Sequence, residues 1–295
     1  MLRINLITIG IILITIIAAS VLVLAGSQNS IYLYQLPLFA VCGVLIFIIQ
    51  WIAFIPSYIY KTEKYFDLTG SLTYITMVVL VLTTVKSGDI RAWIILIAVA
   101  LWAIRLGAFL FTRILSSGSD TRFDNLKTNF LKLLMTWSLQ GLWIFVTFGA
   151  GLAALSSKKE SEFGILDIIG TLIFVIGFSI EIISDQQKTT FRKMQRDGFI
   201  NAGLWKYSRH PNYLGEILIW IGITFLSINV LTGWQYLTLI SPVFVALLLI
   251  KISGIPMLEK KSDAKWGHLT EYQNYKNQTA VLIPNIIDVL KRKQN

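Results

Sequence analysis

One segment of fourteen residues, 203–216, gathers most of the side-chain types that binding and catalysis use. It reads GLWKYSRHPNYLGE and leads directly into an apolar run. Pro211 favours the first turn of a helix, because the backbone N–H that proline lacks would have no partner there. The N-terminus of such a helix attracts anions, and Arg209 and His210 immediately precede it. The segment therefore predicts a site for an anionic ligand, and its aromatic residues suit a ligand that carries rings.

The same segment places further polar side chains at helical spacing. Asn212 and Glu216 lie four residues apart and would share one helix face. Arg209 carries a planar guanidinium that can contact a phosphate with two hydrogen bonds. A patch of basic and aromatic side chains at the membrane surface is the alternative interpretation, but Asn, Glu and His are not typical of one. We therefore expect a ligand site formed by Tyr207, Arg209, His210, Asn212, Tyr213 and Glu216.

Two carboxylates close the apolar run that precedes this segment. Glu181 and Asp185 are also four residues apart and would share a helix face, and Arg192 follows seven residues later. Carboxylates at a membrane boundary can accept hydrogen bonds from ribose hydroxyls or from an amide. The alternative is that both form salt bridges with the basic residues of 188–196. The spacing leaves both interpretations open.

Three further basic residues lie within apolar runs or near their ends: Arg105, Arg113 and Lys251. A charged side chain inside a membrane is costly and normally faces a cavity or a partner. Near the end of a span it can instead extend to the membrane surface. We expect these cations to contribute to binding an anionic ligand, with surface extension as the alternative.

The segment 61–70 separates two apolar runs and contains Glu63, Tyr65 and Asp67. An acid or a phenol at a membrane entrance can polarise a carbonyl group or donate a proton. These three residues are therefore the catalytic candidates, and a polar turn without chemistry is the alternative. Only two histidines, His210 and His268, are present, so we expect no multi-histidine metal centre.

The composition predicts a membrane protein that holds these side chains between helices. Hydrophobic residues make up 55% of the chain and charged residues 14%. We expect spans at roughly 4–25, 37–60, 71–85, 92–112, 130–153, 164–184, 213–230 and 235–256. Because the third of these is short and the seventh begins inside the polar segment, seven spans is the alternative to eight.

The basic residues predict the orientation of these spans. With the N-terminus in the cytoplasm, most Lys and Arg residues fall on the cytoplasmic side, as do the three longer loops that we expect at 113–130, 185–212 and 257–295. Both termini are then cytoplasmic. The net charge of +10 reflects topology and contact with the anionic lipids of a bilayer, so we expect no nucleic-acid partner.

At these positions the chain resembles a known family. The segment 203–216, together with Ser184-Asp185-Gln186-Gln187, the run 251–259 and the closing Tyr275, is similar to the steroid 5-alpha-reductase-like membrane proteins, in particular to a bacterial branch. The similarity covers roughly residues 37–285 and is most specific from 181 to 259. It implies an all-α, polytopic transmembrane bundle and a single membrane domain, in which residues 1–130 form the substrate entrance and 131–295 bind the cofactor.

The resemblance implies an enzyme that uses NADPH to reduce an activated C=C bond of a small lipidic enone, in a bacterial inner membrane. It places Asp185, Arg192, Asn212 and Glu216 at cofactor-contacting positions. The family's substrate-binding tyrosine falls near Trp102, which has no hydroxyl, and its acidic partner falls near Asp67, with Glu63 as the competing residue. The full set of expected cofactor-binding residues is Arg105, Arg113, Glu181, Asp185, Arg192, Tyr207, Arg209, His210, Asn212, Tyr213, Glu216, Lys251 and Tyr275.

Two other functions remain open. Isoprenylcysteine carboxyl methyltransferases share an Arg-His-Pro-x-Tyr element, so a membrane methyltransferase that uses S-adenosylmethionine is one alternative. The upstream run 184–187 and the length of the chain favour the reductase. A lipid-binding membrane protein without catalytic activity is the other alternative, because Trp102 replaces the family's tyrosine.

Overall fold

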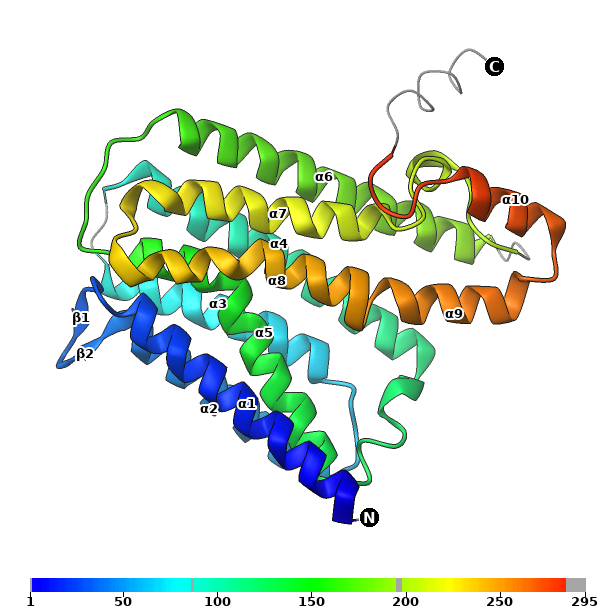
Figure 1. Ribbon diagram of the computed structural model, residues 1–295, viewed down its shortest axis with the longest axis horizontal. Coiled ribbons are helices and arrows are strands. Elements are labelled where there is room, and N and C mark those ends of the chain that lie inside the picture. Colours follow the sequence, from blue (N-terminus) through cyan, green and yellow to red (C-terminus); the bar gives the residue numbers. More distant parts are fainter. Residues whose placement is uncertain (1, 86–87, 195–197, 285–295) are drawn as a thin grey trace. The chain divides into compact units, whose positions relative to one another are not determined.

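The computed structural model describes residues 2–85, 88–194 and 198–284, and most of them are helical (Figure 1). A short antiparallel hairpin, which pairs Tyr32 with Pro37, separates the first two helices. The α-helices and strands are α1 (Leu2–Gly26), β1 (Tyr32–Leu33), β2 (Leu36–Pro37), α2 (Leu38–Ile59), α3 (Phe66–Thr84), α4 (Ile90–Ser117), α5 (Phe130–Ser156), α6 (Ile165–Lys193), α7 (Pro211–Ser227), α8 (Ser241–Leu247), α9 (Ile255–Trp266) and α10 (Thr270–Gln278). The 3₁₀ and π turns are η1 (Thr121–Phe123), η2 (Gly203–Lys206), η3 (Ile228–Val230), η4 (Gly233–Ile240) and η5 (Leu248–Ile252).

Within these described ranges, eight helical segments are long and apolar enough to cross a membrane. The chain is therefore an all-α polytopic membrane protein, and the eight-span expectation is favoured over seven. The third segment, Phe66–Thr84, reaches 19 residues because the helix begins before its apolar part does. Orientation stays a prediction, and the C-terminal residues 285–295 lie outside the described part of the chain.

Several expected loops are helical. Helix α4 continues to Ser117, so Arg113 lies on a helix, and Asp67 lies in the first turn of α3. Helix α6 continues to Lys193, and the expected C-terminal loop contains α9 and α10. The expectation of loops at these positions was wrong for a physical reason: hydropathy marks where lipid contact ends, whereas a helix continues for as long as its backbone hydrogen bonds do.

The chain forms two compact units, which are described separately. The first contains Met1–Ile168 and Ile223–Ser241, and the second contains Ile169–Gly222 and Pro242–Asn295. In the first unit, α5 packs against α1 and α2, and α3 packs against α4. Buried polar side chains join these helices. Gln50 donates to Thr73 over 2.8 Å, the hydroxyls of Tyr74 and Thr147 share a hydrogen bond, and Trp51 donates to Ser138 over 3.1 Å.

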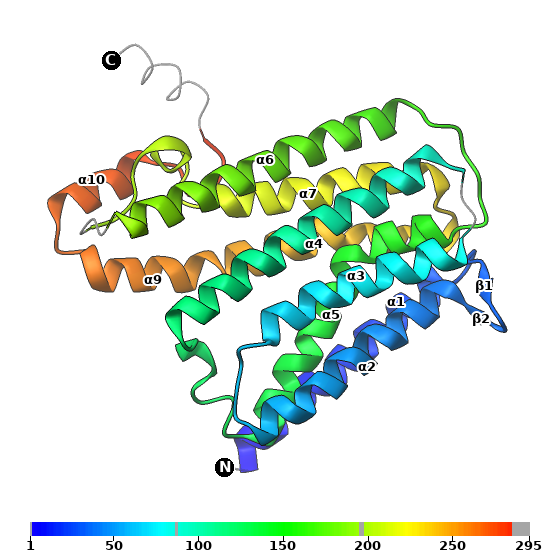
Figure 2. The ribbon, with the colours of Figure 1, turned by 180° about the vertical axis from the view of Figure 1, so that it is seen from behind.

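In the second unit, α6 and α7 run side by side (Figures 1 and 2). Two glycines allow their backbones to touch. A methyl carbon added at Gly215 would lie 2.6 Å from the carbonyl oxygen of Gly177 and 2.7 Å from the backbone nitrogen of Glu181. A further close contact joins Gly222 to Gly170 and Phe174. The two helices therefore have a fixed register, which places Glu181 beside Gly215 and its neighbour Glu216.

We expect Gly215→Ala to destabilise the protein because the added methyl group meets backbone atoms that cannot move separately. Overpacking costs about 1–3 kcal/mol, and we expect the upper part of that range here because the clash is with backbone, so the cost exceeds the roughly 1 kcal/mol that alanine gains over glycine in a helix. Thermal unfolding in detergent measures the change. Gly10→Ala in α1 is the matched control, because nothing lies within 4 Å of its added carbon. Equal unfolding temperatures for the two variants would contradict the close contact.

Candidate functional site

The polar segment 203–216 is anchored to the end of α6. Gly203 adopts a φ of 61°, which favours glycine, and its neighbour Leu204 donates its backbone N–H to the side chain of Gln187 over 2.9 Å. The indole N–H of Trp205 donates to the carbonyl oxygen of Ser184 over 3.0 Å. Because these bonds join the turn to α6, the start of α7 has a defined place. Helix α7 begins at Pro211, as the sequence predicts.

The C-terminal part of the chain binds the other side of this segment. The backbone N–H of Arg209 donates to the carbonyl oxygen of Ala280 over 2.9 Å. The hydroxyl of Tyr275 donates to the carbonyl oxygen of Trp205 over 2.8 Å, and burial raises the pKa of this tyrosine well above its ordinary value. Tyr275, which we expected to contact a cofactor, therefore uses its hydroxyl to hold the turn.

Glu259 on α9 is the central carboxylate of the cluster. Its oxygens lie 2.8 Å from Nε2 of His210, 3.4 Å from a terminal nitrogen of Arg209 and 3.2 Å from Nζ of Lys276. The His210 ring also stacks on Tyr213, with the two ring planes 13° apart. Sequence reasoning missed Glu259 as a site residue, although it closes the similar run 251–259. Its spacing from Arg209 carried no signal, because the two residues are far apart in the sequence and only the tertiary fold brings them together.

A second carboxylate, Asp263, lies one turn further along α9. It accepts from Lys276 over 2.6 Å and from the hydroxyl of Tyr272 over 3.0 Å. Burial would lower the pKa of Lys276, but hydrogen bonds to Asp263 and Glu259 hold it above its ordinary value. Burial and the bond to Asp263 raise the pKa of Tyr272 to about 12. These contacts clamp α10 onto α9 and thereby support the bond between Tyr275 and the turn.

Arg209 is held in place by hydrogen bonds, but one of its N–H donors has no acceptor. One terminal nitrogen binds Glu259 and also the carbonyl oxygen of Lys276 at 3.2 Å. Its Nε is buried and has no hydrogen-bond partner within the described part of the chain. A buried donor without a partner costs free energy, so an acceptor from a ligand would be favoured here. An anionic ligand at the N-terminus of α7 would supply that acceptor.

The α6–α7 register brings together four residues that the sequence predicts as ligand contacts. Glu181 and Asp185 are buried on α6, and Glu181 lies beside Gly215 of α7. Asn212 and Glu216, both half-buried, belong to the first turns of α7. Carboxylate and amide groups from two helices are therefore gathered at one level of the second unit.

The other predicted ligand-binding residues of the second unit are more exposed than Glu181 and Asp185. Arg192, near the end of α6, and Lys251, in the π turn η5, are both exposed, and Tyr207 is half-buried. The structure does not bring Arg192 or Lys251 into the contacts around Glu259. Two exposed cations on the same unit can still extend toward an anionic ligand.

In the first unit, the structure separates the roles of the two acidic candidates. Glu63 is buried, and it accepts from the backbone N–H of Asp120 over 2.8 Å and from Lys127 over 3.2 Å. Hydrogen bonds to Asp124 and Glu63 raise the pKa of Lys127. Burial would raise the pKa of Asp120, but hydrogen bonds from Arg122 hold it below its usual value. Glu63 therefore fastens the α2–α3 turn to the segment after α4.

Asp67 lies in a different environment. It is half-buried, and one oxygen is 3.7 Å from the guanidinium of Arg113, a residue expected to bind the cofactor. Tyr65 is exposed and stacks on Phe111. The half-buried Arg105 lies over the Phe109 ring at 5.5 Å. Of the three catalytic candidates, Asp67 and Tyr65 therefore keep access to a ligand.

Trp102, which the resemblance aligns with a substrate-binding tyrosine, is fully buried in the first unit. Its ring meets the Tyr74 ring edge-on at 5.0 Å. Of these two aromatic side chains, Tyr74 has a hydroxyl, and this hydroxyl shares a hydrogen bond with Thr147. The sequence pattern did not single out Tyr74, because a tyrosine inside an apolar run is typical of a helix core.

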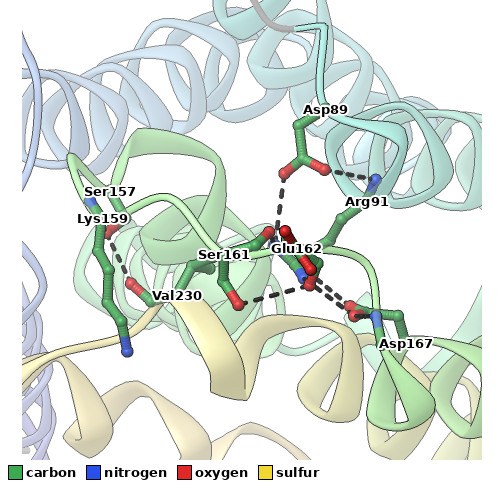
Figure 3. Close-up of polar contacts among 9 residues, drawn as sticks. Asp89, Arg91, Ser157, Lys159, Ser161, Glu162, Asp167 and Val230 are labelled. Atoms are coloured by element: carbon green, nitrogen blue, oxygen red, sulfur yellow. Dashed lines mark hydrogen bonds and ion pairs between the residues drawn. The ribbon is translucent and has the colours of Figure 1, made fainter.

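A buried ion pair at the start of α4 is a further feature that the sequence did not reveal (Figure 3). Arg91 is 1% exposed and donates to the two carboxylate oxygens of Asp167 over 2.6 and 2.9 Å. It also donates to the carbonyl oxygens of Ser161 and Glu162, over 3.0 and 2.8 Å. Arg91 therefore joins α4 to the loop before α6 and to the first turn of that helix. This arrangement is structural, because its donors are used within the protein.

We expect Arg91→Ala to destabilise the protein by about 3–5 kcal/mol, because it leaves the buried carboxylate of Asp167 without its cation. Denaturant or thermal unfolding in detergent measures the loss. The matched control is Arg122→Ala, which removes an exposed pair with Asp120 and should cost less than about 1 kcal/mol. A loss for Arg91→Ala as small as that of the control would contradict the structural role.

These features define a class: a polytopic helical membrane protein with a polar cluster at the N-terminus of one helix. The model of a family described as "Protein of unknown function (DUF1295)" matches residues 53–279, and the chain belongs to this family. A protein of Schizosaccharomyces pombe named "Uncharacterized protein C594.04c" is 30% identical over 102 residues. That match spans 28% of this chain and 30% of the yeast protein. No solved structure matches the chain.

Proposed function

We propose that this protein is a membrane-embedded reductase that uses NADPH to reduce an activated C=C bond of a lipidic enone. The observation that carries the proposal is the register of α6 and α7. It gathers Glu181 and Asp185 on one helix and Asn212 and Glu216 on the other, beside Arg209 and the N-terminus of α7. Anion-binding and hydroxyl-binding groups are thus combined in one unit, as a phosphorylated dinucleotide requires.

The residues present fit such a cofactor. Arg209 keeps a buried Nε–H that lacks an acceptor, and a phosphate oxygen would satisfy it. The positive end of the α7 helix dipole lies beside the same charge. Glu181, Asp185 and Glu216 are acceptors suited to ribose hydroxyls, and the amide of Asn212 can both donate and accept. His210 and Tyr275 hold the shape of the site through Glu259 and Trp205.

When bound, NADPH supplies a hydride for the β-carbon of an enone. The chain must then stabilise negative charge on the enone oxygen and provide a proton. We assign the proton to Asp67 in its protonated form, acting directly or through the hydroxyl of Tyr65. The guanidinium of Arg113, 3.7 Å from Asp67, would add positive charge beside the developing enolate. Glu63 is not assigned a catalytic role, because its carboxylate binds Asp120 and Lys127.

The decisive experiment is a ligand titration of the full chain in detergent, followed by thermal shift. We expect NADPH to stabilise the protein and S-adenosylmethionine not to do so. Arg209→Ala should weaken NADPH binding by about 1.5–3 kcal/mol, or roughly ten- to hundredfold in Kd, because it removes charge-assisted hydrogen bonds. Asn212→Ala should weaken it by a smaller factor.

Two further variants separate binding from folding. Arg209→Lys keeps the charge but loses the planar fork, and it should bind more weakly than the wild type while unfolding at a similar temperature. Lys261→Ala, an exposed cation on α9, should leave NADPH binding unchanged. Stabilisation by S-adenosylmethionine alone would replace the proposal with methyl transfer, and no stabilisation by any of these ligands would favour a lipid-binding protein without catalytic activity.

A further inference from the structure

The first unit contains an open cavity of about 970 Å³ at the end where α3 and α5 finish and α4 begins. Those three helix ends and the loop 157–163 form its walls, together with Ile31 and Val230. The volume lies at the upper end of the range of small-molecule sites. Asp67 lies at the other end of α3, about 25 Å away along the helix, so this cavity is separate from the proposed catalytic acid.

The position of the cavity along the spans sets its depth in the bilayer. Residues at the end of Phe66–Thr84, at the start of Ile90–Ser117 and at the end of Phe130–Ser156 line it, and all three segments are apolar enough to cross a membrane. Lipid headgroups meet a protein where its spans end. Trp93, in the first turn of α4, is exposed, as is typical of an aromatic residue at this level. The cavity therefore lies at the depth of the phospholipid headgroups.

The lining of the cavity is amphipathic. Polar and apolar atoms contribute to its surface in similar proportions. Ile90 and Phe163 line it and are also exposed, so the apolar part of the lining is accessible from outside the protein. The charged residues of the lining are Asp89, Arg91, Lys158, Lys159, Glu160 and Glu162. Such a surface suits a ligand that combines an apolar part with a charged head.

The charge of Arg91 is already used within the protein. Its five N–H donors bind the carboxylates of Asp167 and Asp89 and two carbonyl oxygens of the loop 157–163 (Figure 3). Arg91 therefore holds the loop in place and leaves ligand binding to the other charged residues of the lining.

Further hydrogen bonds order the same loop. The hydroxyl of Ser157 donates to the carbonyl oxygen of Val230 over 2.7 Å, and the backbone N–H of Lys158 donates to the carbonyl oxygen of Asn29 over 2.9 Å. A ligand therefore meets a wall whose backbone is already ordered, which lowers the entropy cost of binding.

The remaining charges of the lining have both signs. Lys158 and Lys159 are cations, whereas Asp89, Glu160 and Glu162 are carboxylates. Within the described ranges, the side chains of Lys159, Glu160 and Glu162 form no ion pair or hydrogen bond, and Figure 3 shows Lys159 extending away from the ion pair of Arg91. An anionic headgroup would meet the carboxylates and a cationic one the lysines. A zwitterionic headgroup can place each of its charges beside an opposite one.

The carboxylates favour one kind of zwitterionic headgroup. A primary ammonium has three N–H donors that carboxylates can accept. A quaternary ammonium has no N–H donor and is bound best by a cage of aromatic rings. Among the described residues that line the cavity, Phe163 alone is aromatic, so such a cage is missing there.

We propose that this cavity binds a zwitterionic phospholipid whose headgroup carries a phosphate and a primary ammonium, that is, a phosphatidylethanolamine. Lys158 and Lys159 attract the phosphate, and Glu160 and Glu162 attract the ammonium. The apolar part of the lining receives the beginning of the acyl chains. This site goes beyond the proposed reductase function, and binding requires neither NADPH nor turnover.

Native mass spectrometry of the delipidated full chain in detergent tests the proposal. Three probes share the same two acyl chains: phosphatidylethanolamine, phosphatidylcholine, which is quaternary, and phosphatidylglycerol, which lacks the ammonium. We expect phosphatidylethanolamine to bind roughly three- to tenfold more tightly than the other two, the range of one net hydrogen bond. Glycerophosphoethanolamine, a fourth probe without acyl chains, should bind most weakly, because it has no apolar part to bury.

Two double variants separate the contributions of the two signs of charge. Glu160→Gln with Glu162→Gln should abolish the preference for phosphatidylethanolamine over phosphatidylcholine, because the carboxylates that distinguish the two ammonium groups are removed. Lys158→Gln with Lys159→Gln should weaken both lipids alike, because both carry the phosphate. All four side chains are exposed, so we expect both variants to unfold at the wild-type temperature in the absence of lipid.

The matched control is Lys61→Gln with Lys64→Gln, which changes two exposed lysines at the α2–α3 turn of the same unit and should leave every affinity unchanged. Equal binding of the three lipids, or a preference for phosphatidylethanolamine that survives the carboxylate variant, would overturn the inference. Tightest binding of phosphatidylglycerol would replace it with a site for anionic lipids. Glycerophosphoethanolamine binding as tightly as the lipid would replace it with a site for a soluble phosphate ester.

Discussion

The contact between α6 and α7 is the constraint on which the candidate cofactor site depends. Helices approach this closely only where side chains are absent, and Gly177 and Gly215 meet that condition. A wider separation would move Glu181 away from the first turns of α7 and would disperse the polar groups. In the proposed function the glycines contribute without touching a ligand, because they set the register that gathers carboxylates and an amide at one level.

Glu259 orients the basic side chains on the other side of the segment 203–216. A carboxylate beside Arg209, His210 and Lys276 orients each of them, and α10 closes over it through Asp263 and Tyr272. Arg209 is thereby held by one end of its guanidinium, while its Nε–H lacks an acceptor. Preorganisation of this kind reduces the entropy that an anionic ligand would otherwise lose on binding.

Much of the membrane architecture could be predicted from the sequence, because apolar length is a direct physical requirement of a span. The start of α7 at Pro211 was predictable for the same kind of reason, since proline has no N–H to lose there. The pairings of Glu259 and of Arg91 were not predictable. Arg91 and Asp167 are 76 residues apart in the sequence, and single charges at the ends of apolar runs resemble ordinary boundary residues.

The two acids of the α2–α3 turn show how structure assigns different roles to residues that look equivalent in sequence. Glu63 binds a backbone N–H and a lysine, so its charge is already stabilised and removing it would loosen the turn. Asp67 lies 3.7 Å from the guanidinium of Arg113 and remains half-buried. A carboxylate that is fully used by the protein cannot also serve a ligand without breaking the fold. Glu63 therefore holds the α2–α3 turn in place, and Asp67 is the acid that remains available for the proposed chemistry.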